Sequence, residues 1–104
     1  MRQVITKEMV LIAAKEAVTD LGFHHIGPKG YGCTVDGRRC LSFEAVHRLG
    51  APITGPMSGA QETLEVHVNQ YGATFEPAAK SLLAQLISLN DAGTEWGRAF
   101  EAVV

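Results

Sequence analysis

The side chains best suited to chemistry in this 104-residue chain are its two cysteines and four histidines. Six residues separate Cys33 from Cys40, and six more separate Cys40 from His47. Thiolates and imidazoles are favoured ligands of Zn²⁺, so these three residues, with His24 or His25, could complete a four-coordinate site. A zinc knuckle, however, places its two cysteines only two to four residues apart. We therefore expect no cofactor, and keep zinc as the alternative.

The same thiols permit two other kinds of chemistry. Cys40 and His47 could form a nucleophile–base pair, with a neighbouring arginine lowering the thiol pKa, but no third group is present to orient the histidine. Cys33 and Cys40 could also form a disulfide if they lie opposite each other in a hairpin. The absence of a credible secretory signal and the small loop it would close argue against that bond. Packed, metal-bound and bridged thiols all stay open.

Other catalytic motifs in the sequence are incomplete. The stretch from Gly30 to Thr34 lacks the third glycine of a dinucleotide fingerprint. In the stretch from Gly55 to Gly59, the serine stands one place late for a nucleophile elbow. The sequence therefore favours a non-enzymatic protein over an enzyme.

Composition indicates one globular domain spanning residues 1–104. Apolar residues make up 46% of the chain, charged residues 19%, and the net charge is −2. Arg38, Arg39 and Lys29 lie close together, but the acidic balance disfavours a nucleic-acid partner. No apolar run reaches membrane-spanning length, so we expect no membrane partner and a cytoplasmic location.

Helices are predicted in the first and last thirds of the chain. Apolar spacing predicts a helix over 7–21, capped by Thr6 and ended by Gly22. Pro77 suits the first position of a helix over 77–89. A final helix is expected after Thr94, which would cap it.

The middle of the chain carries the strand signals. Asp36-Gly37 between residues 31–35 and 38–41 is typical of a two-residue β-hairpin and would place Cys33 opposite Cys40. A short helix over 43–49, capped by Ser42, follows. Residues 51–60, rich in glycine and proline, predict a mobile loop.

Residues 63–71 allow two interpretations. Leu64, Val66 and Val68 alternate with polar residues, which favours a strand, whereas Leu64, Val68 and Tyr71 have helical spacing. We rank the strand first. The expected fold is α+β: three to four helices packed on a β-hairpin, with or without one additional strand.

Several of these segments form a recognisable series. A helix ends before Phe23 and a polar pair, the sequence Asp-Gly-Arg-Arg-Cys occupies 36–40, and Leu-Asn-Asp-Ala-Gly-Thr occupies 89–94. The series resembles an uncharacterised family of small actinobacterial and actinobacteriophage proteins with an Asp-Gly-Arg-x-Cys hairpin and a Trp-Asn-Asp stretch before the last helix. Phe23 and Leu89 stand where that family usually has tryptophan, and residues 51–71 lie outside the resemblance. The family has no established activity, so the resemblance implies a source more than a mechanism.

The leading functional hypothesis is an interaction protein that is encoded by a phage and binds a host protein. Its predicted surface combines the hairpin tip with the following loop: Asp36, Gly37, Arg38, Arg39, Ile53, Met57 and Ser58. The alternative is a small zinc-binding or thiol-dependent domain that uses Cys33, Cys40 and His47.

Overall fold

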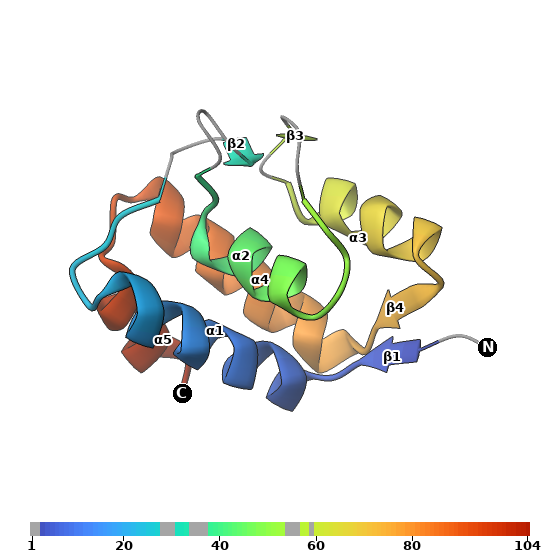
Figure 1. Cartoon of the computed structure of the whole chain (residues 1–104), viewed down its shortest axis with the longest axis horizontal. Helices are drawn as coiled ribbons and strands as arrows, with labels where there is room; N and C mark the ends of the chain where they lie inside the picture. The colour runs from blue at the N-terminus through green and yellow to red at the C-terminus, as the bar shows by residue number, and fades with distance from the viewer. Residues whose placement is uncertain (1–2, 28–30, 34–37, 54–56, 59) are drawn as a thin grey trace.

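Five helices and two pairs of short strands make up the described part of the chain (Figure 1). The computed structural model describes residues 3–27, 31–33, 38–53, 57–58 and 60–104, with the backbone alone for 31–33 and 57–58. In chain order the elements are β1 (Gln3–Ile5), α1 (Lys7–Leu21), β2 (Tyr31–Cys33), α2 (Leu41–Arg48), β3 (Met57–Ser58), α3 (Gln61–Gln70), β4 (Ala73–Phe75), α4 (Pro77–Asp91) and α5 (Trp96–Val103). The predicted α+β class is confirmed, with helices predominating.

Helix α4 occupies the middle of the fold and contacts each of the other four described helices. Helices α1 and α2 pack side by side in front of it (Figure 1). Each helix buries an apolar stripe because its apolar residues recur at helical spacing. The largest fully buried side chains are those of Trp96, Phe43, Leu41, Ile53, Leu64, Leu82, Leu83 and Leu86.

The first predicted helix is confirmed at both ends. Thr6 Oγ1 accepts a hydrogen bond from the Met9 backbone N–H at 3.2 Å, which satisfies a donor that the first turn leaves unpaired. Gly22 follows Leu21 with φ of +102°, a conformation that side-chain-bearing residues rarely adopt. This end fixes where the chain leaves α1 toward β2.

A parallel strand pair that the sequence analysis did not predict joins the start of the chain to α4. Strand β1 pairs with β4 in the register Gln3↔Ala73 to Ile5↔Phe75. Parallel neighbours need a long crossover, which α1, α2 and α3 provide here. Each strand has only three residues, too few to show an alternating pattern.

Residues 61–70 correct the first-ranked prediction, since they form helix α3 and not a strand. Leu64 and Val68 are fully buried, whereas Val66 is 59% exposed. A strand would have placed all three side chains on one face. The second-ranked helical interpretation was therefore right.

The predicted hairpin is not confirmed. Strand β2 pairs antiparallel with β3, and Cys33 lies opposite Met57, not Cys40. Its predicted turn, residues 36–37, lies outside the described part of the chain, as do residues 34–35 of its first strand, and residue 41 already belongs to α2. The segment 51–60, predicted as a mobile loop, contains β3 and two buried residues, Ala51 and Ile53.

Three helix boundaries differ slightly from those predicted. Helix α2 begins at Leu41, so Cys40 takes the N-cap position in place of Ser42. Helix α4 starts at Pro77 as predicted but continues to Asp91. Helix α5 has Glu95, not Thr94, at its N-cap.

Candidate functional site

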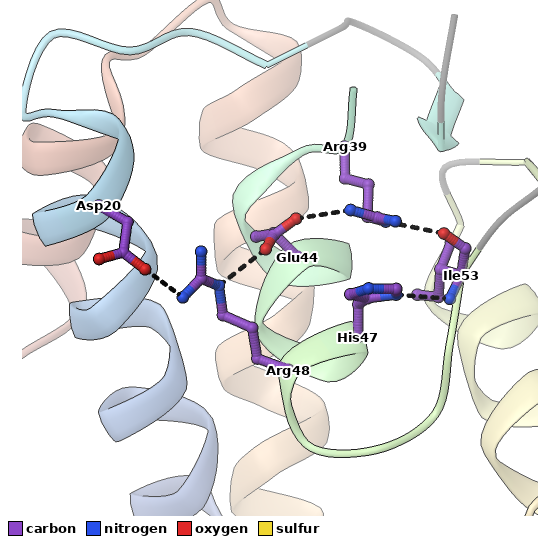
Figure 2. A network of polar contacts seen from close by, with 6 residues as sticks. All are labelled: Asp20, Arg39, Glu44, His47, Arg48 and Ile53. Atoms are coloured by element: carbon purple, nitrogen blue, oxygen red, sulfur yellow. Dashed lines mark hydrogen bonds and ion pairs between the residues drawn. The ribbon is translucent and has the colours of Figure 1, made fainter. Parts of the chain in front are cut away.

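A buried carboxylate on α2 organises the densest polar network in the described structure (Figure 2). Glu44 Oε1 accepts from Arg39 Nη1 at 2.9 Å, and its Oε2 accepts from Arg48 Nε at 2.7 Å. Arg48 lies one helical turn after Glu44, so the sequence spacing itself allows this contact. Arg48 also donates to Asp20 Oδ2 on α1 at 2.6 Å, and this bond raises the Arg48 pKa. The network thereby links α1, α2 and the segment before α2.

The network extends to the backbone of Ile53, which follows α2 (Figure 2). Arg39 Nε donates to the Ile53 carbonyl at 2.8 Å, and the Ile53 N–H donates to His47 Nδ1 at 2.8 Å. The preceding carbonyl, that of Pro52, lies 2.8 Å from His67 Nε2 on α3. We call residues 51–53 the clasped segment, because α2 and α3 both hold its backbone.

These hydrogen bonds fix the proton positions on two histidines. Since a backbone N–H only donates, His47 Nδ1 must be unprotonated; since a carbonyl only accepts, His67 Nε2 must carry a proton. Burial and the nearby Arg39 charge lower the pKa of His47, while Glu44 opposes them. His47 is therefore held neutral as a hydrogen-bond acceptor.

The Cys40 thiol is a packed group in this structure. Cys40 is 2% exposed, and its Sγ lies 3.2 Å from Ser42 Oγ. Burial raises the thiol pKa, despite weaker opposing hydrogen bonds from Ser42 and Phe43. A thiol acts as a nucleophile in its thiolate form, so this environment disfavours a nucleophilic role.

The other candidate metal ligands point to separate partners. His24 Nδ1 contacts Glu95, and the His25 ring lies edge-on to Trp96 with centroids 4.4 Å apart. Burial and Arg38 lower the pKa of His25. Within the described residues no three histidine, cysteine, aspartate or glutamate side chains are grouped to hold a metal ion, and the Cys33 side chain lies outside that part.

The predicted interaction surface is only partly exposed. Arg38 is exposed and donates to the Ile26 carbonyl at 3.2 Å. The Arg39 side chain is 16% exposed and held by Glu44, and Ile53 is fully buried, so neither belongs on a contact surface. Met57 and Ser58 form β3, while Asp36 and Gly37 lie outside the described residues.

Three large apolar side chains at and just after the end of α1 are exposed, and the sequence did not reveal their exposure. Leu21, Phe23 and Ile26 are 48%, 39% and 42% exposed. The available signal was the presence of two large apolar residues, Phe23 and Ile26, directly after the predicted end of the helix at Gly22. We refer to these three residues and Arg38, which donates to the Ile26 carbonyl, as the Arg38 face.

One open hollow of about 580 Å³ lies along α1 and shares Asp20 with the polar network. Residues of α1 line it: Ile12, Lys15, Glu16, Thr19 and Asp20. Thr19 Oγ1 donates to the Lys15 carbonyl and Asp20 binds Arg48, so two of its polar side chains already have partners. The residues that line this hollow therefore do not form a recognisable set of catalytic groups.

Comparison with known protein families, with characterised proteins and with solved structures gives no match to this chain. The resemblance to small actinobacterial and phage proteins therefore stays a prediction. Among the helices in the described ranges, none is long and apolar enough to cross a membrane.

Proposed function

We propose that this chain is a small non-enzymatic domain that binds another protein through the Arg38 face. The observation that carries the proposal is that three large apolar side chains are exposed within residues 21–26, and that the exposed Arg38 donates to the carbonyl of Ile26 in the same segment. Scattered exposed apolar residues are ordinary, but a group of them beside a charge is typical of a contact surface.

The backbone beneath this face is held in place at several points. The Phe23 and His25 carbonyls accept from the N–H groups of Gly97 and Trp96, at 2.9 and 2.8 Å. The Ile26 carbonyl accepts from Arg38. A surface fixed before binding loses less conformational entropy when a partner arrives, which favours affinity.

The use of the polar residues also favours binding over catalysis. Glu44, Arg39 and His47 satisfy one another or the backbone of the clasped segment, and the Cys40 thiol is buried. A catalytic group must reach the reacting atoms of a substrate, and these groups are already committed inside the fold.

The chemistry of the face defines the partner. A matching protein surface presents apolar side chains around a carboxylate, which would pair with the Arg38 guanidinium. The resemblance noted above supports a phage-encoded chain acting on a cytoplasmic protein of an actinobacterial host.

Affinity capture from an actinobacterial lysate with matched variants tests this proposal. Ile26→Lys places a charge within the Arg38 face, and Val66→Lys makes the same change at a more exposed position on α3, at the other end of the molecule (Figure 1). We expect Ile26→Lys to lower recovery of a stoichiometric partner about tenfold or more, as loss of a central contact does. Recovery with Val66→Lys should equal that of the wild type.

Two results would contradict the proposal. One is equal recovery by both variants, which would locate any contact elsewhere. The other is recovery that requires added zinc or the Cys40 thiol, which would favour the metal- or thiol-dependent alternative.

A further inference from the structure

One of the hydrogen bonds that hold the clasped segment can form only while its histidine is neutral. The Ile53 N–H donates to His47 Nδ1 at 2.8 Å (Figure 2). If Nδ1 gained a proton, two N–H groups would face each other and the bond would be lost. The Ile53 side chain is fully buried, so the position of this backbone decides whether an apolar side chain stays covered.

The second histidine of the segment behaves differently. His67 Nε2 donates to the Pro52 carbonyl at 2.8 Å, and it does so whether the ring is neutral or charged. Arg39 likewise donates to the Ile53 carbonyl at any pH near neutrality. Of these three contacts to residues 52–53, only the one at His47 needs a deprotonated side chain.

We propose that His47 makes the clasped segment a pH-sensitive latch, closed at neutral pH and opened locally when the imidazole is protonated. The inference goes beyond the proposed function, because it concerns residues 51–53 and involves no partner. The segment leads to β3, which pairs with β2, so local opening acts on the connection between α2 and that strand pair.

The charges around His47 make its protonation unfavourable while the latch is closed. Arg39, from the segment before α2, and Arg48, on α2 itself, both oppose a positive imidazole. Glu44 favours it, but both Glu44 oxygens are held by those arginines. From α3, the titratable side chain at this segment is that of His67, which contacts the Pro52 carbonyl. Protonation therefore competes directly with closure.

Amide hydrogen exchange followed by NMR tests the latch, with a chelator present throughout. The quantity measured is the protection factor of the Ile53 amide, corrected for the intrinsic effect of pH, between about pH 7.5 and about pH 5. We expect the protection factor to fall about five- to tenfold, because this is the change that the loss of one hydrogen bond's net stabilisation produces. The midpoint should coincide with that of the His47 imidazole, followed in the same samples through its ring nitrogens.

Two variants separate His47 from the other histidines. His47→Asn places an amide oxygen where Nδ1 stood and cannot titrate, so Ile53 protection should become independent of pH. His67→Gln retains a donor toward Pro52, so the wild-type fall should persist.

Three outcomes would overturn the proposal: constant Ile53 protection in the wild type, a midpoint that follows another histidine, or an undiminished fall in His47→Asn. The wild-type midpoint decides the matter even if a variant fails to fold.

Discussion

Glu44 is a buried charged residue that stabilises the fold through its ion pairs. Both of its oxygens accept hydrogen bonds from arginine side chains, and it is 8% exposed. A buried charge is tolerated when its partners are present and is costly once one side of the pair is removed. Spacing in the sequence allowed the pair with Arg48, but nothing in the sequence distinguished Arg39 as a buried partner from Arg38 as an exposed one.

Glu44→Gln should lower the free energy of unfolding by about 2–3 kcal/mol, because two arginines lose their counter-charge in a poorly solvated site. Urea unfolding at neutral pH measures the change. Glu65→Gln is the matched control, since Glu65 pairs with Lys80 at a more solvent-accessible site, where the Glu65 side chain is 26% exposed. That substitution should change stability by less than about 0.5 kcal/mol. Equal effects of the two substitutions would contradict the central role given to Glu44.

Gly27 lies where only a residue without a side chain fits. A Cβ there would lie 2.8 Å from the Cys40 Cα and 2.9 Å from the Arg39 carbonyl oxygen, and both are backbone atoms. Gly27→Ala should therefore cost about 1–3 kcal/mol of stability, as overpacking does.

Gly97→Ala is a useful comparison with Gly27→Ala, because the added methyl group would meet a side chain and not the backbone. A Cβ at Gly97 would meet the Phe23 ring, a side chain that is partly exposed. Removing the ring should remove the clash, so Phe23→Ala combined with Gly97→Ala should cost less than the sum of the single changes. Strict additivity in denaturant unfolding would argue against this contact.

Among the elements, α3 shows where pattern alone was insufficient. Over residues 64–68, apolar residues at every second position fit a strand, while positions 64 and 68 also fit one helical face. Packing decides between them, because α3 covers β4 and α4 with Leu64 and Val68. The short strands could not be predicted either, since their partners are distant in sequence.

Paired substitutions distinguish a helix from a strand at this site. Val68→Ala should lower stability by about 1–3 kcal/mol, because it removes buried apolar volume. Val66→Ala should change it by less than about 0.5 kcal/mol, because Val66 is exposed in α3. Comparable losses at both positions would indicate the strand face instead.

At the scale of the whole molecule, the helices with clear caps and apolar stripes were predictable and the site was not. Thr6, Gly22 and Pro77 marked helix ends that the structure confirms. The candidate residues Cys40, His24 and His25 turned out to be packed or separately paired. The Arg38 face depends on where residues 21–26 lie in the folded chain. The spacing of apolar residues in the sequence does not predict that position.

Stability of the whole chain should fall on mild acidification. The pKa of His47 is lowered mainly by burial, as is that of His25, so between these pKa values and the unfolded value of about 6.5 the unfolded chain binds more protons. This part of the stability is fully present above about pH 6.5 and is lost as pH falls. The urea midpoint should drop between about pH 7.5 and 5.5, and drop less in His47→Asn; a constant midpoint would contradict this.

The measurement that most directly tests the central claim is site-specific photo-crosslinking. A photoreactive amino acid is placed at Ile26 in one sample and at Val66 in another, both exposed in the free chain. The proposed function predicts one discrete crosslinked protein from actinobacterial lysate at Ile26, and none at Val66. A discrete product at Val66 alone, or no discrete product at Ile26, would contradict a protein contact at the Arg38 face.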